Sequence, residues 1–359
     1  LLGLQQAPHY FRRLGKGRYK KAPADVVEQA LLAIARKKEQ QAQIQAWADQ
    51  LLAGQCPDEI RQQLFRILFK PDKNGLHAQA VAQAAQRKQQ PILEVLRSAG
   101  AIDSAYAFHW QRFLFEHFPK GIRFPDHPVL AAPEDLPLAE GVAAYSIDDS
   151  FTTEIDDALS VQGLGTSTWT VGIHIAAPGL AIQPGGAWDQ VARDRLSTVY
   201  MPGHKITMLP NALVQSFSLD AGRPVPALSL YVRFDAQTLE CLGSESRLER
   251  IVIAANLRHD QLDELVTESW LQTTPLDQGH QLPHAELSAL FRLAQHLKRG
   301  REQIRGKPEH FNRPDPIFRI EGVKEDGPTG QETVEIGFRR RGAPLDLIVA
   351  EAMILANRT

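Results

Sequence analysis

An acidic segment in the middle of the chain carries the residue types best suited to chemistry. Five carboxylates fall within the ten residues 148–157. They are Asp148, Asp149, Glu154, Asp156 and Asp157. Apolar, strand-like sequence flanks the segment on both sides, so burial of the flanks brings the acids close together. Carboxylates at short range repel one another, and a cation that prefers hard oxygen ligands, such as magnesium, manganese or calcium, relieves that repulsion.

Two other structures compete for this segment. A calcium loop of the EF-hand type requires glycine at its sixth position and glutamate at its twelfth. Counted from Asp148, these positions hold Thr153 and Leu159, which excludes that loop. A solvated acidic turn is the usual fate of a charge run, but Phe151 and Ile155 interrupt the acids and require burial. The pattern therefore favours a metal site formed by the carboxylates at positions 148, 154, 156 and 157.

Such a site suits phosphodiester hydrolysis. Two divalent cations roughly 4 Å apart are a recurring arrangement for this reaction, in which one activates a water and the other stabilises the departing oxygen. Four carboxylates are enough to hold the pair while a substrate phosphate supplies further ligands. A nucleophilic serine or cysteine is then unnecessary.

The composition is that of an ordinary soluble globular protein. The 359 residues are 43% hydrophobic and 23% charged, and they are sufficient for two or three domains. A run of about 18 uncharged apolar residues is missing, which argues against a membrane span. Residues 1–22 are too basic for a secretory signal. Two distant cysteines, Cys56 and Cys241, fit a reduced cytoplasmic protein, and nothing in the sequence indicates an oligomeric state.

Charge is distributed unevenly along the chain. Residues 1–100 contain 16 Lys and Arg against 8 Asp and Glu, although the net charge of the whole chain is −2. A basic front part beside an acidic cluster is typical of a protein that guides a polyanion toward a metal site. A soluble helical domain with a basic end is the simpler alternative.

Hydrophobic periodicity predicts a helical front part and a strand-rich remainder. Helices are predicted at residues 25–53, 58–69, 76–88 and 91–99. A polar interruption at 37–41 leaves open whether the first of these is one helix or two. Short helices joined by a tight turn form a candidate helix-turn-helix. After a proline-rich linker at 121–140, strands are predicted at 158–161, 168–176, 227–234 and 248–255, the first two as a hairpin, and helices at 284–303 and 344–357.

Several segments resemble, in order and spacing, the ribonuclease II / ribonuclease R (RNB) family of exoribonucleases. Residues 145–160 are similar to the family's catalytic motif, and residues 171–176 to the strand after it. Residues 195–202, which end in Val-Tyr-Met-Pro, resemble its "S-x-Y-L-P" turn. Residues 208–210, 218–229 and 348–357 match later motifs, the last of them on a helix. Together these segments cover residues 141–359.

The resemblance implies processive 3′→5′ hydrolysis of single-stranded RNA to nucleoside 5′-monophosphates with Mg²⁺, Mn²⁺ being the alternative. It identifies four acids as both catalytic and metal-binding. They are Asp148, Glu154, Asp156 and Asp157. It assigns RNA-binding roles to Tyr200, which would stack near the 3′-terminal nucleotide, to the helix acid Glu351, and to Phe311 as a second stacking aromatic. His174 occurs where some members have histidine, and a hydrogen-bonded strand histidine is an equal alternative to a functional one.

The chain departs from the family pattern in three places. Glu154 occupies a position that is usually aspartate, and Ala177 replaces another aspartate. The chain ends at Thr359, before the family's "S-P-I-R-R-Y" segment with its phosphate-binding arginines and before a terminal OB-fold, so a fragment is expected. The front differs too, because residues 1–118 look helical where many members have cold-shock β-barrels. Residues 15–23 and 113–119 are similar to stretches in a branch without those barrels.

The expected fold class is α+β. A helical, basic N-terminal domain at 1–120, of winged-helix or helix-turn-helix type, is followed by the linker at 121–140 and an incomplete mixed α/β RNB-type catalytic domain at 141–359. The expected function is a metal-dependent exoribonuclease of the cytoplasm that acts in RNA turnover. A non-catalytic RNA-binding homologue of the same fold is the alternative. A DNA-binding regulator would need selectivity for duplexes, which nothing in the sequence encodes.

Overall fold

The computed structural model describes residues 7, 9–15, 17–128, 131–273, 282–309, 314–323, 327–340 and 342–359. The chain divides into two compact units. Unit 1 comprises Leu1–Ile122 with Thr329–Gln331, and unit 2 comprises Arg123–Pro328 with Glu332–Thr359. Among the helices of the described residues, none combines the length and the apolarity that crossing a membrane requires.

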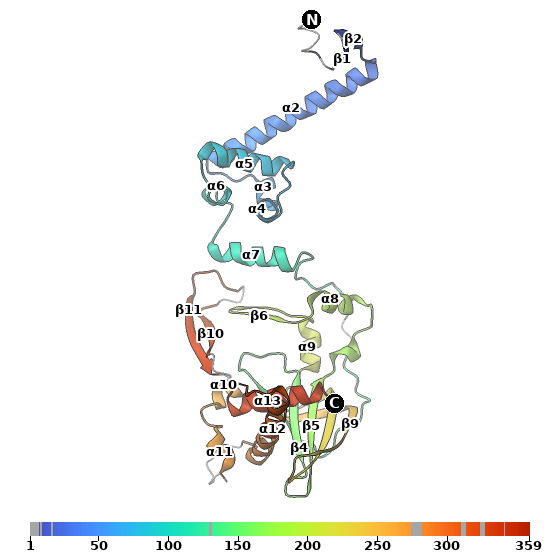
Figure 1. Ribbon diagram of the computed structural model, residues 1–359, viewed down its shortest axis with the longest axis vertical. Coiled ribbons are helices and arrows are strands. Elements are labelled where there is room, and N and C mark those ends of the chain that lie inside the picture. The colour runs from blue at the N-terminus through green and yellow to red at the C-terminus, as the bar shows by residue number, and fades with distance from the viewer. Residues whose placement is uncertain are drawn as a thin grey trace. The chain divides into compact units, whose positions relative to one another are not determined.

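Unit 1 is helical apart from a short ribbon near its N-terminus. Its helices are α2 (Ala24–Leu52), α3 (Asp58–Gln62), α4 (Leu64–Phe69), α5 (Leu76–Lys88), α6 (Ile92–Ser98) and α7 (Ala105–His117). Helices α2, α5 and α6 share a core that includes Leu51, Val81 and Leu96. Only the second half of α2, from Ile44 onward, is buried, and its first half leads away from the other helices of the unit toward the ribbon (Figure 1).

Unit 1 decides one alternative that the sequence left open and differs from the sequence-based expectation in two places. One continuous helix, Ala24–Leu52, covers this stretch, because the polar side chains at 37–41 are exposed on the helix surface and require no break. The helix predicted at 58–69 is divided at Gln63, whose φ is −108°. The prediction of helix throughout residues 1–118 was wrong at its start, where β1 (Phe11–Gly15) and β2 (Arg18–Lys21) form an antiparallel ribbon. Gly15 and Gly17 have φ values of 88° and 76°, which suit a chain reversal between strands.

Unit 2 is built on a closed five-stranded barrel. Its strands are β3 (Ala144–Asp148), β4 (Asp157–Gln162), β5 (Thr168–Ala176), β8 (Pro224–Asp235) and β9 (Cys241–Arg258), hydrogen-bonded in this order. Neighbouring strands are antiparallel, except that β3 and β9 run parallel. Asp148 pairs with Arg258 at the ends of these two strands. Since parallel strands end at the same edge of a sheet, the residues that follow β3 and β9 lie together.

Two helices cover the barrel and share its core. They are α12 (His284–Arg305) and α13 (Pro344–Ala356) (Figure 1). Leu290 of α12 and Ile348 of α13 belong to one apolar cluster with Ile173 of β5. The predicted β4–β5 hairpin is confirmed, as are the strands at 227–234 and 248–255 within β8 and β9 and the helices at 284–303 and 344–357. The predicted α+β class is confirmed as well.

Shorter elements complete unit 2. They are η1 (Pro178–Ala181), α8 (Ala187–Arg195), β6 (Val199–Met201), β7 (His204–Ile206), α9 (Asn211–Phe217), α10 (His259–Leu262), α11 (Glu268–Gln272), β10 (Pro314–Glu321) and β11 (Thr333–Arg340). Strands β6 and β7 pair as an antiparallel ribbon in which Tyr200 lies opposite Lys205. Strands β10 and β11 form a second such ribbon.

The barrel contains a buried polar network around His174. This residue is fully buried, and its Nε2 and Nδ1 atoms lie 2.9 Å from Ser160 Oγ and 2.8 Å from Ser229 Oγ. Burial lowers the pKa of His174 to about 4, so the ring is neutral and each nitrogen is paired with a hydroxyl. Gly172 provides the space for this network, because a Cβ at that position would lie only 2.4 Å from Ser160 Oγ. His174 is therefore a hydrogen-bonded core histidine.

Candidate functional site

The four predicted acids lie at the junction of β3 and β4. Asp148 is the last residue of β3 and Asp157 the first residue of β4, while Glu154 and Asp156 lie in the connecting loop. The two strands pair only through residues 144–145 and 159–160, away from this junction. The strand ends that carry the acids are therefore free of mutual backbone pairing, and the loop between them extends over residues 149–156, which we call the acidic loop.

A buried residue fixes the acidic loop near its end. Ile155 is 2% exposed and packs in an apolar cluster with Leu219. The Ile155 N–H donates to Ser218 Oγ (3.2 Å), and the Ile155 carbonyl accepts from the Leu219 N–H (2.9 Å). Because Ile155 is held on both sides, Glu154 and Asp156 have fixed backbone positions next to it.

Burial and mutual repulsion raise the pKa values of three of the acids. Burial, followed by the charges of Asp156 and Asp148, raises the pKa of Asp157 to about 7. Burial is also the main cause that raises the pKa of Asp148 and of Asp156. Glu154 adds to the repulsion at Asp156. The acids thus lie close enough to destabilise one another's charged forms, which is the condition that a bound cation relieves.

The donor atoms suit a hard divalent cation. Asp148 Oδ2 and Glu154 Oε1 are buried and accept no hydrogen bond, so oxygen lone pairs remain available for a ligand. The four acids do not already have the geometry of a closed coordination sphere. Within the described part of the chain, the group of three whose ligand atoms all lie within 4.8 Å of one another is Asp149, His259 and Asp260. A cation at the predicted acids would therefore draw their side chains together.

Glu154 links the acidic loop to the β6–β7 ribbon. Thr198 Oγ1 donates to Glu154 Oε2 (2.7 Å), and Lys205 Nζ lies 3.3 Å from Glu154 Oε1. Lys205 Nζ also donates to Thr153 Oγ1. The Lys205 contact is electrostatic, because Glu154 Oε1 has no hydrogen bond with acceptable geometry. Lys205 and Thr198 were not predicted as site residues, and their only signal in the sequence was their position beside the Tyr-Met-Pro turn.

Tyr200 faces the same acids. It is directly opposite Lys205 on the ribbon and is 57% exposed. Burial of its hydroxyl, followed by the charges of Glu154, Asp156 and Asp148, raises the pKa of Tyr200 to about 12, so the phenol stays neutral. Tyr200 and these three acids line one pocket of about 580 Å³ whose other walls are largely apolar. The structure therefore brings an exposed aromatic ring and the acidic cluster into one cavity.

Comparison with known proteins identifies the family. Residues 139–359 match the RNB domain. The chain belongs to the RNB family. The predicted resemblance is confirmed, because curated proteins with similar sequences are named ribonuclease R and exoribonuclease 2. The match includes all four acids, Tyr200 and Glu351.

The similarity to individual proteins is partial. Ribonuclease R of Chlamydia trachomatis is 33% identical over 216 residues, which cover 57% of this chain and 30% of that protein. An uncharacterized ribonuclease of Synechocystis is 29% identical over 255 residues, 63% of this chain and 36% of that protein. The chain thus spans about a third of the length of these relatives. An active-site mutant of the Dss1 exoribonuclease from Candida glabrata matches the fold over 88% of this chain and 45% of that one, with a TM-score of 0.61 at 17% identity.

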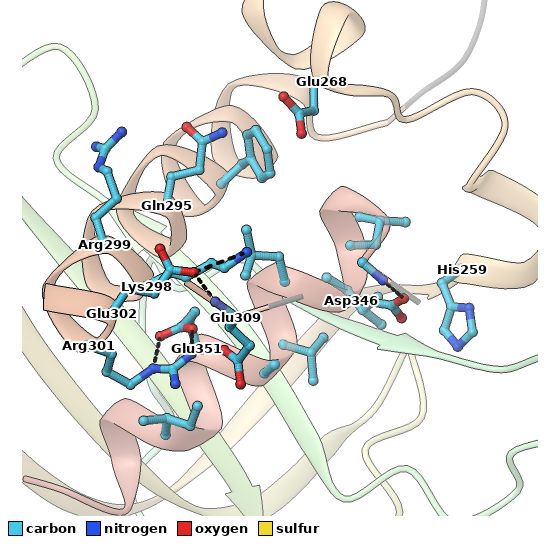
Figure 2. Close-up of a pocket in the computed structure, with 18 residues that line it drawn as sticks. His259, Glu268, Gln295, Lys298, Arg299, Arg301, Glu302, Glu309, Asp346 and Glu351 are labelled. Carbon is cyan, nitrogen blue, oxygen red and sulfur yellow. Dashed lines mark hydrogen bonds and ion pairs between the residues drawn. The ribbon is translucent and has the colours of Figure 1, made fainter. Parts of the chain in front are cut away.

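In the RNB domain, Glu351 lies in a different pocket. It is 1% exposed on α13, and its carboxylate is bound by the guanidinium of Arg301 on α12 (Figure 2). Arg301 also donates to Glu309 Oε2 (2.8 Å), and these two hydrogen-bonded carboxylates raise its pKa. The pocket, of about 570 Å³, is lined mainly by α12 and α13, and His259 of α10 also borders it. A contact between Glu351 and RNA would require this ion pair to open, and its RNA-binding role stays a prediction.

Phe311, the predicted second stacking aromatic, lies outside the described residues. Asp149, His259 and Asp260 were not predicted to have a role, and their side chains come together at the ends of β3 and β9. The signal for this group was a charged Arg-His-Asp sequence at the end of a long strand, but the sequence did not reveal which strand lies beside it.

Proposed function

We propose that this protein is a metal-dependent exoribonuclease. It shortens single-stranded RNA processively from the 3′ end, releases nucleoside 5′-monophosphates and acts in RNA turnover in the cytoplasm. The observation that carries the proposal is a pocket of the RNB domain in which Asp148, Glu154 and Asp156 lie beside an exposed tyrosine, with Asp157 next to them in the chain. Asp148 Oδ2 and Glu154 Oε1 are buried there without a hydrogen bond to any described residue. A protein that only binds RNA would gain nothing from carboxylates that destabilise one another and repel a phosphate backbone.

The proposed metal ligands are four carboxylates. They are Asp148, Glu154, Asp156 and Asp157. They would hold Mg²⁺, or alternatively Mn²⁺, because both ions favour oxygen ligands. When bound, such ions supply an activated water and stabilise the departing oxygen of the phosphodiester. Glu154 would bind the metal through Oε1, while Thr198 Oγ1 donates to Glu154 Oε2 (2.7 Å). This hydrogen bond would orient the glutamate side chain, which is longer than that of aspartate.

Tyr200 has the proposed role of holding the 3′-terminal nucleotide by stacking. The residue is 57% exposed beside the acids, and its phenol is neutral, so it adds no charge that would repel a phosphate. Stacking depends on the π-face that all bases share, and it therefore accepts any sequence. Phe311 and Glu351 are proposed as further RNA contacts on the family pattern alone.

The test is an assay with single-stranded RNA labelled at its 5′ end. With Mg²⁺, we expect a ladder of products that shorten progressively from the 3′ end, together with nucleoside 5′-monophosphates. EDTA should stop the reaction while RNA binding persists. Binding without shortening in the presence of either Mg²⁺ or Mn²⁺ would favour the alternative, a non-catalytic RNA-binding homologue.

Residues 1–120 are proposed as an RNA-guiding domain, with residues 121–140 as a linker to the catalytic domain at 141–359. The β1–β2 ribbon is the strongest basic feature of that part, because residues 1–24 contain no acid. Arg12 and Lys20 are exposed and directly opposite each other on the ribbon. Like charges in a cross-strand pair destabilise the ribbon, and a polyanion would relieve this repulsion.

The ribbon gives a prediction about salt dependence. In a variant with Arg12→Gln, Arg13→Gln and Lys20→Gln, we expect RNA to bind more weakly, and the slope of log affinity against log salt to decrease in magnitude by about 2. Each lost contact between a cation and a single-strand phosphate contributes about 0.7 to that slope. The matched control neutralises the exposed cations Arg36, Lys37 and Lys38 of α2 in the same way. Equal slopes for the two variants would show that the ribbon has no special role.

A further inference from the structure

The outer side of the acidic loop is bound by one short segment at the end of β9. The segment comprises residues 258–261, the last residue of β9 and the first three of α10, and we call it the β9–α10 segment. All four of its side chains contact residues 149–152 of the acidic loop. The parallel pairing of β3 with β9 brings the acidic loop and the β9–α10 segment together, although the two segments are about 110 positions apart in the chain.

Ser150 is held at both its backbone and its side chain. Asp260 Oδ1 accepts from the Ser150 N–H (2.9 Å) and from the Ser150 hydroxyl (2.9 Å). Gln261 Nε2 donates to Ser150 Oγ (2.9 Å). Three hydrogen bonds therefore converge on an exposed residue two positions after Asp148, where a loop would otherwise be bound mainly to water.

Arg258 and His259 hold the residues on either side. Arg258 Nη1 donates to the Asp149 carbonyl (2.9 Å) and lies 3.5 Å from the Thr152 carbonyl. His259 Nε2 is 3.2 Å from Asp149 Oδ1, and the histidine is 8% exposed. The Arg258 guanidinium, which reaches two carbonyls of the loop, also places positive charge near the acids that repel one another.

An additional metal site at Asp149, His259 and Asp260 is the competing interpretation. Their ligand atoms lie within 4.8 Å of one another. However, Asp260 Oδ1 already accepts two hydrogen bonds from Ser150, and His259 Nε2 already faces Asp149. His259 Nδ1 makes no hydrogen bond within the described part of the chain and lies 3.8 Å from Asp263 Oδ2. Since Asp260 Oδ1 and His259 Nε2, two of the atoms that a cation would need, are already turned toward the acidic loop, these contacts favour a positioning role.

We propose that the β9–α10 segment positions the acidic loop so that Asp148 and its neighbouring acids are held in place for metal binding. This inference rests on the proposed function, because it assigns how that site is kept in order. The repulsion among the acids would otherwise open the loop, and the segment opposes this from outside the pocket. Residues that orient metal ligands commonly change metal affinity by about 10- to 100-fold when removed.

Asp260 offers a test in which the conservative variant should rescue function. Asp260→Ala removes the acceptor of both Ser150 bonds, and we expect Mn²⁺ affinity, measured by titration calorimetry, to fall by about 10-fold or more. Asp260→Asn keeps a carbonyl oxygen at Oδ1, so its Mn²⁺ affinity should stay near the wild-type value. The control Glu264→Ala removes the same charge from an exposed residue nearby and should change nothing. Ser150→Ala removes the two hydrogen bonds that involve the Ser150 hydroxyl, and it replaces Asp260→Ala in this test if that variant does not fold.

Hydrogen exchange separates this proposal from the proposed function. We expect the amides of residues 149–152 to exchange faster in Asp260→Ala, without metal, than in wild type or Glu264→Ala. Unchanged exchange together with unchanged Mn²⁺ affinity would overturn the positioning role. Loss of Mn²⁺ binding in Asp260→Asn equal to that in Asp260→Ala would overturn it in favour of a direct metal ligand. A wild-type protein that binds no Mn²⁺ and degrades no RNA would contradict the proposed function, while the exchange rates would still decide on the loop.

Discussion

Asp157→Asn is expected to abolish the shortening of RNA. The substitution keeps the size of the side chain and removes one of the four proposed metal-binding carboxylates, so a loss of about 1,000-fold or more in the rate of shortening is expected. RNA binding should persist, because Asp157 contributes negative charge that repels phosphate. The measurement is the 5′-labelled RNA assay with Mg²⁺, and Asp135→Asn, at an exposed position of unit 2, is the control. Shortening by Asp157→Asn at the wild-type rate would contradict the proposed mechanism.

The same substitution should stabilise the protein when no metal is present. The pKa of Asp157 is raised from 3.8 to about 7 in the folded state, so the folded protein binds this proton more tightly than the unfolded chain does. The contribution of Asp157 to the free energy of unfolding is therefore favourable at low pH, and it is lost as the pH rises from about 4 to 7. A shift of about three units corresponds to at most about 4 kcal/mol. Asparagine removes this cost, and we expect a gain of about 1–3 kcal/mol in the free energy of unfolding at pH 8.

Urea denaturation in EDTA at pH 5 and pH 8 tests this gain. The advantage of Asp157→Asn over wild type should be larger at pH 8, and added Mg²⁺ should reverse it, because the metal stabilises only the folded state that binds it. Asp135→Asn should follow wild type at both pH values. A variant that is less stable than wild type at pH 8 in EDTA would show that burial and repulsion do not determine the energetics of this carboxyl.

Much of unit 2 could be predicted because its elements have strong local patterns. Alternation from Thr168 to Ala176 gave β5 with its observed bounds, and the acid run identified where β3 and β4 meet. Unit 1 was harder. The β1–β2 ribbon is short and cationic, and its turn is encoded by Gly15 and Gly17 rather than by apolar periodicity.

The contacts between distant segments could not be predicted. Asp260 and Ser150 are 110 positions apart, and only the parallel pairing of β3 with β9 brings them together. Local periodicity carries no information on which strand lies beside which, and parallel neighbours need no adjacent turn to identify them. Lys205 was missed for a related reason. Its role depends on the register of a three-residue ribbon that sets it opposite Tyr200.

Arg301→Met should destabilise the protein by about 3–5 kcal/mol. The side chains of Arg301 and Glu351 are 17% and 2% exposed, so removal of the arginine leaves a buried carboxylate without its partner. Arg305→Met is the control, because its ion pair with Glu309 (3.3 Å) is 43% exposed on the arginine side and should contribute less than about 1 kcal/mol. Thermal or urea unfolding measures both effects.

The double variant Arg301→Met with Glu351→Met decides what the ion pair is for. Replacing a buried ion pair by apolar side chains of similar volume is often neutral in stability, so the double variant should recover most of the loss in Arg301→Met. If Glu351 serves only the fold, the double variant should bind RNA as tightly as wild type. If Glu351 also contacts the terminal nucleotide, as the family pattern predicts, RNA affinity should stay reduced although stability is recovered. Failure of the double variant to regain stability would mean that the loss in Arg301→Met comes from other contacts of the arginine, among which the Glu309 carboxylate at 2.8 Å is the first to test.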